Sequence, residues 1–192
     1  MSLSEGLAYI GLALVYALVA TGLGMALAAL AGRPLDARGA ALVLATLLMV
    51  FLGLHPFPDP AAVECRAPIL RPFAFLEDYI RLWRAGAPAR VWLQSTGTVA
   101  PVMNFVICLG IGLLLHGKTR RVRVALFYGL GLSGFIELSQ LSGLWGFYPC
   151  PYRHFELDDL ILNVGGVVAG FGLAHGLARL SARLSAGRGP RP

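Results

Sequence analysis

Charged residues are scarce in this sequence. Asp, Glu, Lys and Arg together make up 14% of its 192 residues, whereas 57% of the residues are hydrophobic. A soluble domain carries roughly 25% charged and 45–50% apolar residues. The composition therefore excludes an ordinary soluble domain and favours an integral membrane protein, whose length fits one domain over residues 1–192.

Cysteines and known ligand patterns are also few. The chain has 3 cysteines, no CxxC pair and no histidine at a zinc-binding spacing. This pattern excludes a disulfide-rich scaffold, and we expect neither a metal site nor a cofactor. The net charge of +6 does not indicate a nucleic-acid partner, because the cations lie between apolar blocks, as membrane topology requires.

Five long apolar blocks fill most of the chain, at residues 7–31, 39–56, 97–116, 124–142 and 157–180. The first has no charge over about 25 residues, enough to cross a hydrocarbon core of about 30 Å. A signal peptide is the alternative, since Ala26-Leu27-Ala28 resembles a cleavage site. However, residues 1–6 lack Lys and Arg, and the apolar run exceeds the usual 7–15 or so residues. We predict an all-α fold with five transmembrane helices.

The distribution of Lys and Arg predicts the orientation of these helices. One side holds ten cations: Arg33, Arg38, Lys118, Arg120, Arg121, Arg123, Arg179, Arg183, Arg188 and Arg191. The other side holds six: Arg66, Arg71, Arg81, Arg84, Arg90 and Arg153. Because cytoplasmic segments carry the excess of cations, we expect the N-terminus outside and the C-terminus in the cytoplasm. Residues 57–96 then form a long outer loop, and residues 181–192 form a basic tail, predicted to be disordered.

The outer loop contains an amphipathic segment. Leu76, Tyr79, Ile80 and Trp83 recur at helical spacing, which predicts a short helix lying at the membrane interface. A helix that only caps the bundle is the alternative. Cys65 and Cys150 both fall on the outer side, where an oxidising compartment would allow a disulfide. Cys108 lies inside the third span and is expected to be a small buried side chain.

Polar residues interrupt three of the spans at one depth. Asn104, Glu137 with Gln140, and Asn163 each lie about 8–10 Å below the outer end of their helices. A carboxylate within a span costs about 2.5–3.5 kcal/mol, so Glu137 should face the bundle interior and have a partner. Arg153, at the outer mouth, is the cation expected to meet it. Hydrogen bonds that only join helices are the alternative role for this set.

The fifth span begins with two acids and continues with glycines on one face. Asp159, Asn163, Gly166 and Gly170 are spaced four, three and four residues apart, so they share a face. The glycines would let a neighbouring helix approach closely and point the polar groups into the bundle. Asp158 or Asp159 could instead serve only the N-terminal helix dipole. We predict a polar pocket that opens toward the outer leaflet.

These residues carry a family resemblance. Glu137-x-x-Gln140, Arg153-x-Phe155-Glu156-x-Asp158-Asp159 and Asn163-x-x-Gly166-x-x-x-Gly170, within residues 137–170, are similar to the C-terminal pattern of the VanZ-like family of bacterial membrane proteins. Glu156 stands where aspartate is more usual. Upstream, Asn104 and Gly112 fit the family, whereas Cys108 and Gly110 replace Phe and Pro. The resemblance implies a multi-pass protein of the bacterial inner membrane, concerned with the cell envelope. The family is named after a protein linked to teicoplanin resistance.

Three functions follow as hypotheses. In the first, the pocket binds the headgroup of a lipid, a lipid-linked envelope precursor or a glycopeptide through Asn104, Glu137, Gln140, Arg153, Asp158, Asp159 and Asn163. In the second, the protein is an intramembrane hydrolase or transferase. Glu137 or Asp158 would be the general base, and His154 or Arg153 would stabilise a phosphate or leaving group. In the third, the glycine faces serve a homo-oligomer or a partner membrane protein. A metal site formed by Glu137, Asp158, Asp159 and His154 has no spacing rule to support it.

Overall fold

The computed structural model describes residues 3–186 and is built almost entirely of helices. Five of its helices are long and apolar enough to cross a membrane. They are α1 (Leu3–Leu30), α2 (Ala37–Leu54), α5 (Thr96–His116), α6 (Val122–Leu141) and α8 (Leu157–Ala186). The prediction of a helical protein with five apolar spans is confirmed, and the chain is a multi-pass membrane protein.

The last helix is longer than the sequence predicted. Residues 181–186, assigned to a disordered tail, continue α8 through Ala186. The prediction was wrong there because this stretch contains Ala, Arg, Leu and Ser, with neither Gly nor Pro before Gly187, so nothing in it ends a helix. The rest of the predicted tail, 187–192, lies outside the described residues.

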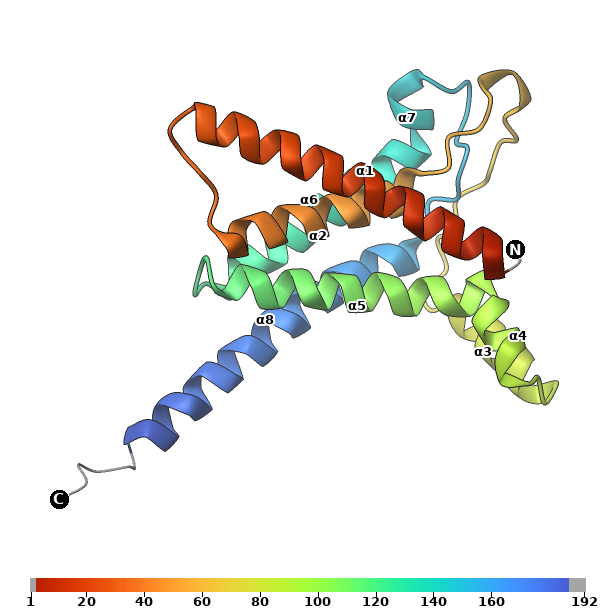
Figure 1. The fold of residues 1–192 in the computed structure, drawn as a ribbon. Coiled ribbons are helices and arrows are strands. Elements are labelled where there is room, and N and C mark those ends of the chain that lie inside the picture. The colour runs from red at the N-terminus through yellow and green to blue at the C-terminus, as the bar shows by residue number, and fades with distance from the viewer. Residues whose placement is uncertain (1–2, 187–192) are drawn as a thin grey trace.

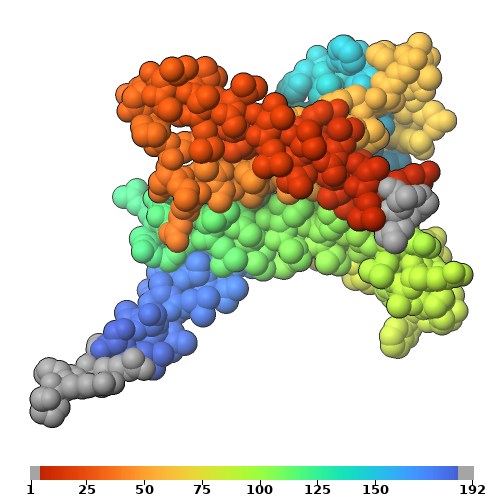
Figure 2. All heavy atoms as spheres, in the orientation of Figure 1, coloured from red at the N-terminus to blue at the C-terminus, as the bar shows by residue number. Residues whose placement is uncertain are grey.

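The five long helices alternate in direction, which gives the bundle two distinct ends (Figure 1). The start of α1, the long connection between α2 and α5, and the connection between α6 and α8 lie at one end, which we name the loop end. The connections α1–α2 and α5–α6 lie at the opposite end. The C-terminal half of α8 extends beyond the other helices there, as Figure 2 shows in blue.

The centre of the bundle is the contact between α5 and α8, where the two backbones touch. A Cβ added at Gly170 would lie 2.0 Å from the Leu109 carbonyl oxygen, and one added at Gly112 would lie 2.1 Å from that of Val167. Gly166 approaches the backbone of α5 in the same way. These glycines therefore allow a separation that no larger residue would permit.

Side chains from the neighbouring helices pack around this contact. The buried apolar core includes Met49 of α2, Ile111 of α5, Ile136 of α6, and Val167 and Phe171 of α8. The first helix contributes little to it. In α1, the residues Ala13, Ala17 and Thr21 are buried, at intervals of four along one face, and α1 packs on α2. Most of its other side chains are exposed and would face lipid.

The loop end contains short helices held together by covalent and backbone links. They are η1 (Pro60–Ala62), α3 (Phe75–Arg84), α4 (Ala89–Gln94) and α7 (Gly143–Gly146). A disulfide joins Cys65 to Cys150. Ile69 donates a backbone hydrogen bond to Phe155 and accepts one from Leu157. The long connection is thereby fixed to the start of α8.

The amphipathic helix α3 occupies the predicted segment of the long connection. Its Trp83 is 79% exposed, and Leu76 and Ile80 are also exposed, which gives it an apolar outer face. On its inner side, the Tyr79 hydroxyl donates to the Thr98 carbonyl oxygen of α5. The sequence did not predict α4, because six residues are too few to show a helical period.

Candidate functional site

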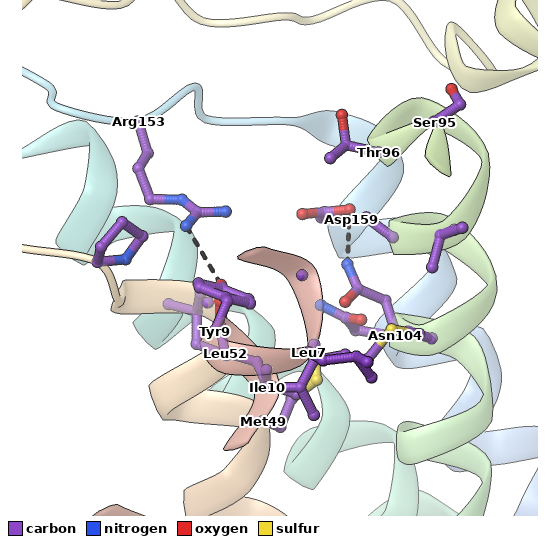
Figure 3. A pocket seen from close by; sticks show the side chains of 18 of the residues that line it. Leu7, Tyr9, Ile10, Met49, Leu52, Ser95, Thr96, Asn104, Arg153 and Asp159 are labelled. Atoms are coloured by element: carbon purple, nitrogen blue, oxygen red, sulfur yellow. Dashed lines mark hydrogen bonds between the residues drawn. The ribbon is translucent and has the colours of Figure 1, made fainter. Parts of the chain in front are cut away.

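A cavity of about 410 Å³ opens at the loop end between α1 and α5 (Figure 3). Its apolar wall comes from α1, α2, α5 and α6, with Leu7, Ile10, Met49, Leu52, Met103 and Ile136. Its polar lining residues include Ser95, Thr96, Asn104, Arg153, Asp159 and Asn163. Four of the residues proposed from the sequence as ligand contacts therefore line one cavity: Asn104, Arg153, Asp159 and Asn163.

Asn104 and Asp159 form one polar wall of the cavity. The Asn104 Nδ2 atom donates to Asp159 Oδ1 at 2.9 Å. Asp159 lies in the first turn of α8 and Asn104 in the first half of α5, so the close α5–α8 contact brings them together. The position of Asp159 also suits the positive end of the helix dipole. The carboxylate is thus held in place, and Asn104 keeps its own Oδ1 as an acceptor.

Arg153 reaches the cavity from the segment that precedes α8. Its Nη1 donates to the carbonyl oxygen of His55 at 2.6 Å and contacts the Tyr9 hydroxyl at 3.4 Å. Neither Glu137 nor Asp159 has a carboxylate oxygen within 4.0 Å of an Arg153 nitrogen. The expected pairing of Arg153 with Glu137 is therefore absent. The cause is the C-terminal end of α2, whose exposed carbonyl holds the guanidinium instead.

Glu137 and Gln140 lie behind the cavity. The Glu137 side chain is 1% exposed, and its Oε2 accepts a hydrogen bond from the backbone N–H of Glu156 at 2.8 Å. Gln140 Nε2 donates to the Gly53 carbonyl oxygen at 2.8 Å. Within the described chain, the Oε1 atoms of both residues are buried without a hydrogen-bond partner. Their hydrogen bonds join α6 to α2 and to the segment before α8.

Asn163 links three helices at the floor of the cavity. Its Nδ2 donates to Ser133 Oγ of α6 at 3.1 Å, and its Oδ1 faces the Cys108 thiol of α5 at 3.6 Å. The sequence did not point to Ser133, since small hydroxyl residues are common in membrane helices. Cys108 is fully buried, as expected.

Asp158, in the first turn of α8, and His154, in the segment before that helix, do not line the cavity. Asp158 accepts hydrogen bonds from the backbone N–H groups of Phe73 and Phe75, so it caps the start of α3. His154 Nδ1 lies 2.7 Å from the carbonyl oxygen of Ala67. The three proposed catalytic residues, these two and Glu137, thus each contact backbone groups at separate places.

His55, at the end of α2, packs beside the cavity. Its ring lies 5.4 Å from that of Tyr9, centre to centre, and its Nδ1 is buried without a hydrogen-bond partner in the described chain. Burial and the neighbouring Arg153 charge lower the pKa of His55, which favours the neutral ring. On the α8 side, burial raises the pKa of Glu156.

The sequence did not predict the wall that α1 contributes. Leu7, Tyr9 and Ile10 of this helix line the cavity, and the Tyr9 hydroxyl donates to the Leu52 carbonyl oxygen of α2. An apolar residue that lines a cavity and one that faces lipid look alike in sequence. The hydroxyl of Tyr9 was the one available signal.

Comparison with known families gives one match. A family model described as VanZ/LLP1 matches residues 41–179, which include most of α2, the whole of α5 and α6, and most of α8. No curated protein and no solved structure matches the chain. The matched region contains the four polar residues Asn104, Arg153, Asp159 and Asn163, whereas the α1 wall precedes it.

Proposed function

The chain belongs to the VanZ/LLP1 family and is a multi-pass membrane protein, and we propose that it binds a lipid or lipid-linked envelope precursor in the cavity between α1 and α5. The observation that carries the proposal is the combination of an apolar wall with Arg153 and Asp159 in one cavity at the end of the bundle. Lipids have the same division, with apolar chains joined to a polar headgroup.

Two features support an outward-facing loop end in the bacterial inner membrane. The opposite end carries the excess of Lys and Arg, as cytoplasmic segments do. The disulfide between Cys65 and Cys150 lies at the loop end, and disulfides persist in oxidising compartments such as the periplasm. With this orientation, the cavity lies at the depth of the outer leaflet. A ligand there could be a cell-wall precursor, which would connect the site with glycopeptide resistance.

Each group in the cavity has a role in this proposal. The Arg153 guanidinium binds anionic oxygens of the headgroup, since its planar fork suits phosphate. Asn104 offers its amide oxygen as a hydrogen-bond acceptor, whereas the Asn163 amide is held by Ser133 and Cys108. The apolar side chains of α1 and α2 contact the acyl chains. Binding is favoured over catalysis, because Glu137, Asp158 and His154 do not line the cavity.

Filling the cavity tests the proposal. Ala100 of α5 lines it, whereas Val102, two residues further on, is 52% exposed and does not. Ala100→Trp should abolish retention of co-purified lipid in native mass spectrometry, while Val102→Trp should leave retention unchanged. Both variants should keep the helical circular dichroism spectrum and elute as a single species. Equal retention by Ala100→Trp and the parent protein would show that lipid does not occupy this cavity.

A further inference from the structure

The cavity presents two opposite charges that do not meet. Arg153 lies on the side of α1 and α2, and Asp159 lies on the side of α5, with open space between them (Figure 3). No nitrogen of Arg153 is within 4.0 Å of an oxygen of Asp159. Each charge is held by neutral partners, the His55 carbonyl and the Asn104 amide respectively. Two half-buried groups of opposite charge thus line one cavity beside an apolar wall without forming an ion pair with each other.

Separated charges of this kind are unfavourable where water is scarce, and a ligand with complementary charges would stabilise both. Resting on the lipid-binding function proposed above, we propose that the ligand is an aminophospholipid whose phosphate binds Arg153 and whose primary ammonium binds Asp159. The ligand class is thus a zwitterion, of which phosphatidylethanolamine is the representative.

The Asp159 side has the acceptors that a primary ammonium requires. An ammonium group has three N–H donors and no acceptor. Asp159 supplies a carboxylate, and the Thr96 hydroxyl lines the same cavity. The Asn104 Nδ2 donates to Asp159, and its Oδ1 accepts no hydrogen bond from the described residues. A trimethylammonium group has no N–H to donate. An anionic glycerol headgroup would bring no counter-charge to the carboxylate.

The Arg153 side has the donors that a phosphate requires. Arg153 Nη1 donates to the His55 carbonyl and contacts the Tyr9 hydroxyl, and a guanidinium has five N–H donors, so more donors remain than these two contacts use. The side chains below it, Leu7, Ile10 and Leu52, are apolar and belong to α1 and α2. An acyl chain would follow them away from the headgroup.

Competition between lipids tests the inference. The purified full-length protein is mixed with equal amounts of phosphatidylethanolamine, phosphatidylcholine and phosphatidylglycerol with identical acyl chains, and bound lipid is measured by native mass spectrometry. Phosphatidylethanolamine should be retained about tenfold more than either competitor, the value of one charge-assisted hydrogen bond. Asp159→Asn should reduce this preference to about twofold or less. Arg153→Gln should reduce the retention of all three lipids about tenfold.

Charge changes outside the cavity serve as controls. Glu64→Gln and Arg81→Gln alter exposed side chains of the loop end and should leave both the amount and the ratio of bound lipid unchanged. If Asp159→Asn does not fold, the unchanged protein can be tested with mono-, di- and trimethylated phosphatidylethanolamine. Retention should decrease with each lost N–H donor.

The outcomes separate the two proposals. In one outcome, Ala100→Trp abolishes lipid retention, but phosphatidylglycerol or phosphatidylcholine is retained as well as phosphatidylethanolamine. This result would contradict the proposed aminophospholipid ligand and leave the proposed lipid cavity in place. The same holds if Asp159→Asn leaves the ratio unchanged. No retained lipid, or retention that Ala100→Trp does not affect, would overturn both.

Discussion

The helix pairs α5–α8 and α1–α2 both contain small residues but use them differently. At the α5–α8 contact, Gly112 and Gly170 bring two backbones together, and an added Cβ would meet a carbonyl oxygen within about 2 Å. In α1, Gly11, Gly22 and Gly24 have nothing within 4 Å of an added Cβ. Glycine content by itself therefore does not show where helices pack.

This difference has a consequence for the site. The closely packed pair fixes Asn104 and Asp159 relative to one another, and so fixes the polar wall of the cavity. The first helix is held by a few small side chains and by the Tyr9 hydroxyl, and it provides part of the apolar wall. The closely packed pair thus positions Asn104 and Asp159, the groups that would select the ligand's cationic part.

The largest expected effect comes from breaking the α5–α8 contact. Gly170→Leu places a side chain where the Leu109 carbonyl lies, and backbone atoms cannot move aside without separating the helices. We expect a loss of more than about 3 kcal/mol, at the upper end for overpacked cores. Size-exclusion chromatography in detergent should then show aggregated protein with no folded peak.

Gly176→Leu is the matched control on the same helix, because nothing lies within 4 Å of its added Cβ. It should elute and unfold like the parent protein. Equal loss in both variants would mean that leucine is harmful anywhere along α8, and that the close contact at Gly170 has no special role.

A smaller effect is expected at Glu137 of α6, the helix that packs on α8. Glu137→Leu leaves the Glu156 N–H without an acceptor, which should cost about 1–3 kcal/mol. Glu137→Gln keeps a carbonyl oxygen for that N–H and should lie close to the parent. Thermal unfolding in detergent measures both variants. A Glu137→Gln variant as unstable as Glu137→Leu would show that the negative charge, and not the hydrogen bond, is required.

The sequence predicted the spans and part of the site for clear physical reasons. Long apolar blocks are the defining signal of membrane helices, and a shared depth brought Asn104 and Asn163 into one region. The partner of Glu137 was not predictable, because it is the backbone N–H of Glu156 and not a side chain. Leu7 of the cavity wall could not be distinguished from a residue facing lipid.

The third prediction concerns α1, which is held by a few small side chains and by the Tyr9 hydroxyl. Tyr9→Phe removes the hydroxyl that donates to the Leu52 carbonyl and contacts Arg153. One such hydrogen bond contributes about 0.5–1.5 kcal/mol, so amide hydrogen exchange should increase in the first turns of α1. Exchange in α5 and α8 should not change.

Tyr16→Phe is the control for this variant, because it keeps the ring contact with Phe51. Faster amide exchange in α5 and α8 of the Tyr9→Phe variant would show that the α5–α8 pair is not held independently of α1.

The smallest effect concerns pH at the contact between α1 and α2. Because the pKa of His55 is lowered in the folded protein, the unfolded chain binds the proton more readily. The stability from the neutral ring is therefore present above a pH of about 6.5 and decreases as the pH falls below it. The unfolding temperature should fall between pH 7.5 and 5.5, and less so in His55→Phe. An identical fall in both proteins would assign the effect to other groups.

The most direct test of the lipid cavity is a structure of the protein in lipid nanodiscs that contain phosphatidylethanolamine, with a bound antibody fragment to aid alignment. We expect headgroup density between Arg153 and Asp159, with acyl density along Leu7 and Ile10. Ordered lipid only on the outer surface of the bundle, with α1 collapsed onto α5 or water alone in the cavity, would contradict it.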